Sequence, residues 1–249
     1  MAVENMKQGF KKIALITGAT RGLGLAVAQL LSEKNYQLIL TGRTKDSLDA
    51  VKKIFCECPY HSFFSGDLLN TAVLDNLCQS ITTPDLIIHA LGGKIHGDMQ
   101  PLSPGILGQS MALNLEVAVK INSYFLPMMQ SRKSGRIIHV SSDASETGDA
   151  APGYAAAKAA INAYVKSTAR FYAKDAIMIC AVLPGIFLHP GSAWDQKKQN
   201  EPKRYQEKLS TFPLGRFLQV KEIASTIVNI ALDASLAYAG SLIKLTGGC

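Results

Sequence analysis

The chain has 249 residues, of which 47% are hydrophobic and 18% are charged, so it can bury one large core and wholesale disorder is excluded. Its formal net charge of +7 admits nucleic acid, membrane phosphate or an anionic small ligand as a partner. The basic residues are scattered and form no tract of five or more, which argues against a nucleic-acid partner. We therefore expect the positive charge to reflect either a soluble protein with a mildly basic surface or the binding of an anionic cofactor or substrate.

The five cysteines, at positions 56, 58, 78, 180 and 249, form no dense framework, which argues against a disulfide scaffold. Cys56-x-Cys58 lacks a second pair at zinc spacing, so no metal site is expected. Met1–Gly9 has no apolar stretch of signal-peptide length. The longest apolar run, 176–188, is interrupted by Pro184-Gly185 and is too short for a membrane span. We therefore expect a reduced, cytoplasmic protein without a membrane segment.

Apolar runs with strand character alternate with longer stretches of helical periodicity. The runs that we expect to form strands are 12–17, 37–41, 61–64, 85–89, 135–140, 177–182 and 241–245. The first helix expected between them has Leu23, Val27, Leu30 and Leu31 on one face. The later helices are expected over 44–55, 70–80, 106–130, 152–174 and 220–232. Repeated strand–helix units build parallel sheets through right-handed crossovers. The sequence therefore predicts one α/β domain over 1–249, a doubly wound, seven-stranded parallel sheet with helices on both faces.

One long polar segment, 189–213, breaks this rhythm. It carries three prolines and is expected to contain a short helix near 196–209. It follows the carboxyl end of the sixth strand, where doubly wound sheets bind ligands. We expect a substrate loop or lid at about 188–212, with a solvated loop as the alternative.

A glycine-rich turn, 17–24, joins the first strand to the first helix. Gly18 allows a tight turn, Gly22 lets the backbone approach a pyrophosphate, and Gly24 lets helix and strand pack closely. The helix that follows offers free N–H groups to phosphate. Because the turn opens a strand–helix–strand unit, it predicts a dinucleotide-binding domain of the Rossmann type.

Tyr154 is the only one of eight tyrosines with a lysine, Lys158, four residues later. This pair opens a helix 12 residues beyond Ser142, and Asn114 lies in the preceding helix. Together with the G-x-x-x-G-x-G spacing of the glycine turn, these residues resemble the short-chain dehydrogenase/reductase family over 13–248. The pattern is most similar to that of 3-oxoacyl-[acyl-carrier-protein] reductases. The resemblance implies that Asn114, Ser142, Tyr154 and Lys158 form a catalytic tetrad.

Carbonyl reduction needs a hydride on carbon and a proton on oxygen, and these residue types suit that chemistry. Because residues i and i+4 share a helix face, the Lys158 ammonium is expected to lower the pKa of Tyr154 from its ordinary value near 10 and to hold the nicotinamide ribose. Ser142 would donate a hydrogen bond to the substrate oxygen. The resemblance implies that Asn114 supports a water linked to Lys158; an ordinary buried amide is the alternative. Counting forward from Gly135 favours Ser142, whereas counting back from Tyr154 favours Ser141, because the intervening loop is one residue shorter than is usual in the family.

The second strand ends without an acid to hold a ribose 2′-hydroxyl. Arg43 stands there, and Arg21 in the glycine turn is similar to a phosphate-binding arginine of NADP-using family members. A guanidinium suits a 2′-phosphate, so the predicted cofactor is NADPH/NADP+. Replacing Gly42 with an acid is expected to favour NADH. The alternative is that the two arginines are solvated surface charges. Asp67 matches the family's adenine-contacting Asp, or caps the helix that begins near Asn70.

Two of the chain's departures from the family pattern bear on the expected cofactor site. The chain reads His89-Ala90-Leu91-Gly92 where Asn-Asn-Ala-Gly is usual, so we expect the bracing hydrogen bonds of the asparagines to be absent and His89 to be structural. His189 replaces a Thr and could reach the nicotinamide carboxamide. The residues expected to line the cofactor site are Gly18, Thr20, Arg21, Gly22, Leu23, Gly24, Arg43, Asp67, Leu68, Ala90, Leu91, Gly92, Tyr154, Lys158, Pro184, Gly185, Phe187 and His189.

The resemblance implies an NADPH-dependent oxidoreductase that reduces a carbonyl to a secondary alcohol, or catalyses the reverse, on a small molecule such as an acyl thioester. An NADP(H)-binding regulatory or scaffold protein with weak or no turnover is the alternative, motivated by the departures at 89–91 and His189. Arg132 and Lys133 form a candidate docking patch for an acidic carrier, or an ordinary solvated helix end. Alanines at 155–157 and 159–160 permit close helix packing, and family members commonly form tetramers, so a homo-oligomer (tetramer or dimer) is expected.

Overall fold

The computed structural model describes residues 12–55, 58 and 60–249. Two features considered above, the segment Met1–Gly9 and Cys56 of the Cys56-x-Cys58 pair, lie outside the described residues. None of the helices in the described part is long and apolar enough to cross a membrane.

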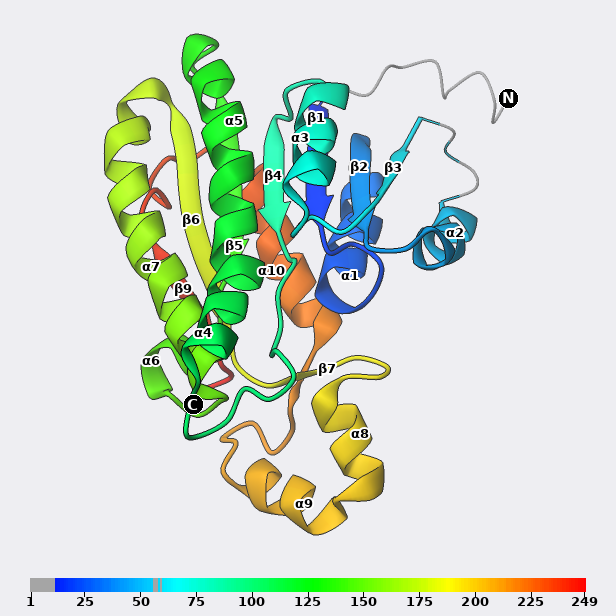
Figure 1. Ribbon diagram of the computed structural model, residues 1–249, viewed down its shortest axis with the longest axis vertical. Coiled ribbons are helices and arrows are strands. Elements are labelled where there is room, and N and C mark those ends of the chain that lie inside the picture. Colours follow the sequence, from blue (N-terminus) through cyan, green and yellow to red (C-terminus); the bar gives the residue numbers. More distant parts are fainter. Residues whose placement is uncertain (1–11, 56–57, 59) are drawn as a thin grey trace.

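Seven parallel strands form the central sheet, which confirms the predicted fold class (Figure 1). Their spatial order is β3-β2-β1-β4-β5-β6-β9. The strands are β1 (Lys12–Thr17), β2 (Tyr36–Gly42), β3 (Ser62–Ser65), β4 (Leu86–His89), β5 (Gly135–Val140), β6 (Ile177–Pro184) and β9 (Leu242–Leu245). The chain runs outward from β1 to β3 and then returns to place β4 on the other side of β1. Ligands of doubly wound sheets bind at such a reversal, outside the carboxyl ends of the strands.

Helices cover both faces of the sheet (Figure 1). Those that pack on it or beside it are α1 (Gly22–Ser32), α2 (Lys45–Ile54), α3 (Thr71–Ser80), α4 (Pro104–Met111), α5 (Val117–Ser131), α6 (Ala144–Thr147), α7 (Pro152–Tyr172) and α10 (Val220–Leu232). Alternate strand residues point to opposite faces. Ile16 and Ile88 therefore pack against α1 and α10, whereas Leu15 and Ile87 pack against α3, α5 and α7. Each face has its own fully buried apolar core, and the two hold the strand ends in fixed positions.

The helix expected over 106–130 is divided into three parts. A π-helical turn, Ala112–Glu116, separates α4 from α5. In this turn the Asn114 side chain donates a hydrogen bond from Nδ2 to the carbonyl oxygen of Ser110, at 3.0 Å. Such π-helical turns inside α-helices occur frequently at functional sites. The extra residue turns Asn114 toward the carboxyl end of β4.

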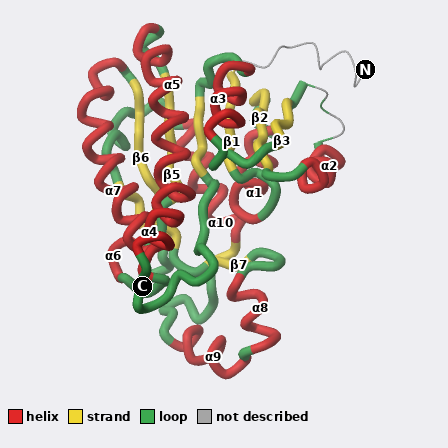
Figure 2. The backbone as a smooth tube through the Cα atoms, in the orientation of Figure 1, coloured by secondary structure: helices red, strands yellow, loops and turns green. Residues whose placement is uncertain are grey.

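The segment expected to hold one short helix contains two, α8 (Ala193–Asn200) and α9 (Pro202–Ser210). They project beyond the carboxyl ends of the strands (Figure 2). A two-stranded sheet of β7 (Phe187–Leu188) and β8 (Leu218–Gln219) connects them to the main domain. Tyr205, Phe212 and Phe217 are buried together in a small separate core, against which Trp194 packs. This segment is therefore a folded unit rather than a solvated loop.

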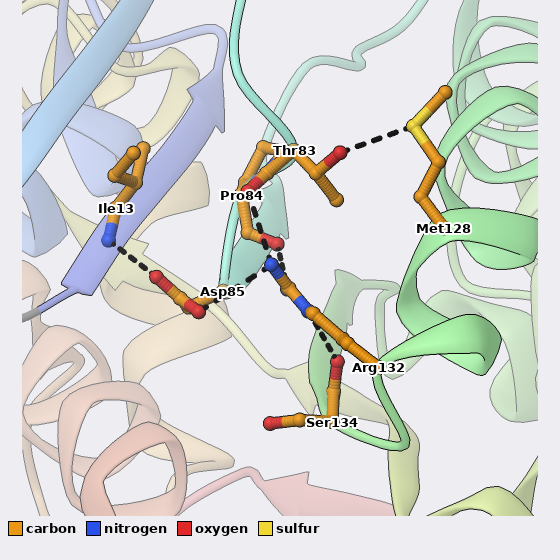
Figure 3. Close-up of polar contacts among 7 residues, drawn as sticks. All are labelled: Ile13, Thr83, Pro84, Asp85, Met128, Arg132 and Ser134. Carbon is orange, nitrogen blue, oxygen red and sulfur yellow. Dashed lines mark hydrogen bonds and ion pairs between the residues drawn. The ribbon is translucent and has the colours of Figure 1, made fainter.

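Arg132 lies at the end of the sheet where the strands begin, opposite to the carboxyl ends of the strands, and holds segments there together (Figure 3). Its guanidinium lies 3.6 Å from the Asp85 carboxylate. That carboxylate also accepts the backbone N–H group of Ile13 in β1, at 2.8 Å. The same guanidinium donates to three backbone carbonyl oxygens, those of Thr83, Pro84 and Ser134. The hydrogen bonds of Arg132 therefore hold neighbouring backbone segments of its own chain together.

Candidate active site

The glycine turn has the close backbone approach that its sequence predicts. Gly18 has φ +67°, and a Cβ there would lie 2.8 Å from the Cα of Leu91 in the segment after β4. A Cβ on Gly24 would lie 2.3 Å from the carbonyl oxygen of Gly18, so helix and turn pack without room for a side chain. The N-cap of α1, Arg21, makes no side-chain capping bond, and the first turn carries no acid. The first N–H groups of α1 are thus available to an anion, and the residues fit a dinucleotide pyrophosphate.

Arg21 and Arg43 are both exposed beside this turn, and neither forms an ion pair with another residue that the structure describes. Arg43 directly follows the carboxyl end of β2. The neighbouring Gly42 is buried, and a Cβ there would lie 2.4 Å from the Thr20 methyl group and 2.9 Å from Leu48 Cγ. The expectation that an acid could be placed at Gly42 is therefore wrong, because that position points into packed side chains.

Asp67 lies exposed after β3, and its Oδ1 accepts the backbone N–H group of Leu69 at 3.0 Å. The N-cap of α3 is Asn70, whose Oδ1 accepts two N–H groups of the first turn. The alternative use of Asp67 as this cap is therefore wrong. Leu68 is buried in the core, so only its backbone could face a ligand.

The segment after β4 keeps its bracing despite the missing asparagines. The N–H group of Leu91 donates to Thr17 Oγ1 at 3.2 Å, and His89 Nε2 lies 2.8 Å from Asn122 Oδ1. His89 stacks on His139 of β5, with ring centroids 4.6 Å apart. Burial lowers the pKa of His89 to about 4, so it is neutral at pH 7. These contacts agree with a structural role for His89.

Asn114 and Lys158 meet across Gly92. A Cβ on Gly92 would lie 2.6 Å from Asn114 Oδ1 and 3.1 Å from Lys158 Nζ. The Asn114 amide accepts from the N–H group of Gly93 at 2.9 Å and donates to its carbonyl oxygen at 3.0 Å. In this structure Asn114 therefore clamps the start of the segment that follows Gly92, in addition to lying beside Lys158.

The two candidate serines face in different directions. Ser141 is buried, and its Oγ lies 2.7 Å from Asn162 Oδ1 and 3.2 Å from the carbonyl oxygen of Lys158, both on α7. Ser142 Oγ accepts the N–H group of Ala144 at 3.2 Å, and its side chain lies near enough to the Tyr154 phenol to lower the pKa of that phenol. Only Ser142 is therefore placed to share a substrate oxygen with Tyr154.

Tyr154 and Lys158 lie one turn apart on α7, with Lys158 Nζ 5.6 Å from the centre of the phenol ring. Burial raises the pKa of Tyr154 above its ordinary value, and hydrogen bonding with Ser142 acts in the opposite direction. The expected lowering of this pKa by Lys158 is thus not the dominant effect. Burial lowers the pKa of Lys158 to about 8, and Nζ donates one hydrogen bond, to the carbonyl oxygen of Val140, at 2.7 Å. The remaining donors of Lys158 fit ribose hydroxyls.

Pro184 and Gly185 close the site at the end of β6. The carbonyl oxygen of Pro184 accepts from the N–H group of Asp143, and the N–H group of Gly185 donates to Leu245 of β9. Phe187 follows in β7, and its ring centroid lies 6.0 Å from that of His189. The His189 ring lies against the glycine turn: a Cβ on Gly22 would lie 2.9 Å from His189 Nε2.

Comparison with known proteins places this site in a family. The family model described as short chain dehydrogenase matches residues 12–201. The chain belongs to the short-chain dehydrogenase family. Because the members of this family are oxidoreductases, the protein is an oxidoreductase of the same family.

Relatives of this short-chain dehydrogenase match over nearly their whole length. The 3-oxoacyl-[acyl-carrier-protein] reductase FabG of Vibrio harveyi is 27% identical over 245 residues, covering 95% of this chain and 96% of that protein. L-xylulose reductase of Bos taurus is 25% identical over 239 residues, covering 94% and 95%. Among solved structures, a 3-oxoacyl (acyl-carrier-protein) reductase from Agrobacterium tumefaciens with NADP bound gives a TM-score of 0.87 at 27% identity, covering 100% of both chains.

One buried acid beside the site, Asp98, is not predicted by the sequence pattern. Asp98 is 1% exposed and accepts the backbone N–H groups of Gly153 and Tyr154. It stands in the irregular stretch after β4, 55 positions before Gly153. No periodicity or local motif marks it; its only signal is an acid in an otherwise weakly charged loop.

Proposed function

We propose that this protein is an NADPH-dependent carbonyl reductase that converts a ketone to a secondary alcohol, or runs the reverse reaction, with Tyr154 as general acid/base. The observation that carries this proposal is the convergence of Tyr154, Ser142 and Lys158 at the carboxyl edge of the sheet, beside the glycine turn. The NADP-bound relative from Agrobacterium tumefaciens supports the choice of cofactor.

When bound, the nicotinamide cofactor would supply the hydride that the carbonyl carbon needs. Ser142 donates a hydrogen bond to the carbonyl oxygen as negative charge develops on it. Tyr154 is protonated at neutral pH, because its pKa is raised, and it gives its hydroxyl proton to that oxygen. The phenolate that forms is stabilised by the Lys158 ammonium and by the Ser142 hydrogen bond. A proton from solvent then restores the phenol; in the reverse reaction Tyr154 accepts the proton from the alcohol.

The residues proposed to hold the cofactor fall into three groups. The N-terminus of α1 with the glycine turn receives the pyrophosphate. Arg21 and Arg43 receive the 2′-phosphate, because two exposed guanidiniums flank that corner. Lys158 receives the nicotinamide ribose with the N–H donors that Val140 leaves unused. The backbone beside Asp67 and Leu68 receives the adenine.

The substrate is proposed to enter between the 93–104 segment and the folded unit of α8 and α9. Irregular segments of this kind carry specificity when a rigid scaffold positions them. An acyl thioester is the first candidate, because two of the relatives are named as 3-oxoacyl reductases. The structure gives little support for Arg132 as the docking site of an acidic carrier. The guanidinium of Arg132 is bonded to backbone carbonyls at the edge of the sheet opposite to Tyr154.

The deciding experiment is NADPH consumption, followed by fluorescence, with a panel of acyl thioesters, quinones, steroids and sugars. Turnover that depends on Tyr154 supports the proposal and names the substrate class. Tight NADPH binding without turnover of any carbonyl would instead support the regulatory or scaffold protein. The retained bracing around His89 argues against that alternative, since the departures that motivated it do not loosen the site.

We also propose a homo-oligomer, a tetramer or dimer. Ala156 and Ala159 are exposed on α7, so another helix could pack closely there. Light scattering during size-exclusion chromatography decides this point, and a monomeric mass would contradict it. The placement of the protein in the cytoplasm stays a prediction.

A further inference from the structure

The carboxylate of Asp98 caps the N-terminus of the helix that carries Tyr154. Its Oδ1 accepts the N–H group of Gly153 at 2.8 Å, and its Oδ2 accepts the N–H group of Tyr154 at 2.8 Å. Asp98 is 1% exposed, so water does not compete for these bonds. Hydrogen bonds between backbone N–H groups and a carboxylate are stronger than those between neutral groups, and an anion is favoured at this end of a helix.

Among the residues that the structure describes, no other side chain is seen to cap α7. The N-cap residue, Ala151, makes no side-chain hydrogen bond, and Pro152 at the first helical position has no N–H group to donate. A Cβ on Gly153 would lie 3.0 Å from Asp98 Oδ1 and 3.1 Å from Ser110 Oγ, so the helix start is pressed against this carboxylate. The first turn of α7 therefore takes its position from Asp98, which belongs to a different part of the chain.

Asp98 also fixes the far end of the segment that begins at Gly93. Ser110 Oγ lies 3.5 Å from Asp98 Oδ2, and the backbone oxygen of Ser110 accepts from the amide of Asn114. Asn114 holds both polar groups of Gly93. Gly93 is thus tied to Asn114 in the π-helical turn, and Asp98 is tied both to Ser110 in the last turn of α4 and to the backbone of Tyr154.

We propose that Asp98 is a positioning residue for carbonyl reduction: its buried carboxylate sets the location of the Tyr154 hydroxyl and joins the substrate segment 93–98 to it. This inference rests on the proposed role of Tyr154. It goes beyond that role because it assigns a function to an acid that acts through the backbone of Tyr154.

The test compares Asp98→Asn and Asp98→Ala with Asn70→Ala. Asn70 is the matched control, because it caps α3 through two N–H groups, at 3.0 and 3.4 Å, and α3 carries no proposed catalytic residue. We expect kcat to fall roughly 10- to 100-fold in Asp98→Asn, since a misplacement of about 1 Å costs about that much. The dissociation constant for NADPH should stay within about twofold of wild type. Asn70→Ala should lower the melting temperature and leave kcat at saturating NADPH unchanged.

Hydrogen exchange of the Gly153 and Tyr154 amides gives a readout that does not need turnover. We expect faster exchange at these two amides in Asp98→Asn and no change there in Asn70→Ala. Wild-type kcat in Asp98→Asn, with a loss of melting temperature like that of the control, would overturn the proposal, as would unchanged exchange at both amides. If wild type turns over no carbonyl, the proposed function fails, and the exchange measurement still decides whether Asp98 anchors Tyr154.

Discussion

The ammonium of Lys158 lies 5.6 Å from the centre of the Tyr154 ring, inside a site where the lysine itself is 3% exposed. Within the described residues no carboxylate lies within ion-pair distance of this ammonium. A buried cation without a counter-ion is costly, and its attraction for a neighbouring anion is strong in such surroundings. We therefore expect Lys158 to favour the phenolate of Tyr154 when a proton leaves it.

Replacing Tyr154 with Phe should remove the proton donor and leave the cofactor site intact. We expect kcat to fall roughly 100-fold or more, with the NADPH dissociation constant nearly unchanged. Steady-state kinetics and a fluorescence titration measure the two quantities. Tyr164→Phe is the matched control on the same helix, because its hydroxyl accepts a hydrogen bond from Asn122, at 3.1 Å, and has no proposed role in catalysis. Near-normal turnover by Tyr154→Phe would remove Tyr154 from the mechanism.

The pH dependence of stability should report the buried Lys158. Its pKa is lowered to about 8 in the folded chain, against an ordinary value of 10.5. Between these two values the unfolded chain binds more protons than the folded one, so the free energy of unfolding should rise with pH from about 8 toward 10. The raised pKa values of the Cys78 and Cys180 thiols act in the opposite direction above pH 9. The measurement is therefore urea unfolding at pH 7.5, 8.5 and 9.5, in wild type and Lys158→Met.

The rise between pH 8 and 9.5 should be absent from Lys158→Met. The same titration predicts that wild type binds NADPH more weakly above pH 8, as the ammonium loses its charge. Parallel pH curves for both proteins would show that Lys158 keeps an ordinary pKa.

The two adjacent serines should separate into a catalytic and a structural residue. Ser142→Ala should lower kcat roughly 10- to 100-fold, because it removes a donor to the developing oxyanion. Ser141→Ala should lower stability by about 1 kcal/mol, because it removes a buried hydrogen bond to α7, and a loss of that size shifts the melting temperature by about 2–4 °C. Kinetics and thermal unfolding of both variants decide the assignment. A large loss of kcat in Ser141→Ala alone would reverse it.

Local patterns were sufficient to predict the sheet, its flanking helices and the glycine turn. The apolar run of β1 and the periodicity of α1 each extend over one element, so the signal lies in neighbouring residues. The division of the segment 189–213 into α8 and α9 also had a local signal, since the residue before a proline, Glu201, tends not to continue a helix.

The remaining features depend on contacts between distant segments. Asp98 meets Gly153 across 55 positions, and Thr17 meets Leu91 across 74. Neither pair leaves a periodic pattern, because each contact exists only once the strands are placed side by side. The choice between Ser141 and Ser142 likewise needed the direction of each side chain, which a count of loop residues does not supply.

Cofactor preference should depend on Arg43, since Arg43 is exposed at the end of β2 and free of ion pairs with the other described residues. A charge-assisted hydrogen bond to a 2′-phosphate contributes roughly 1.5–3 kcal/mol. Exposure favours the low end, which still corresponds to a preference of about tenfold for NADPH. Arg43→Ala should therefore raise the KM for NADPH about tenfold and change the KM for NADH little.

An acid that reverses this preference belongs at position 43 and not at Gly42, where a side chain would collide with Thr20 and Leu48. Arg43→Asp should repel the 2′-phosphate and accept hydrogen bonds from the ribose hydroxyls of NADH. Gly42→Asp is the informative contrast: it should lower the melting temperature and weaken the binding of both cofactors. The measurement is kcat/KM for NADPH and NADH at two ionic strengths, because salt screens exposed charges and should reduce the wild-type preference. Equal use of both cofactors by wild type at low salt would show that Arg21 and Arg43 do not bind a phosphate.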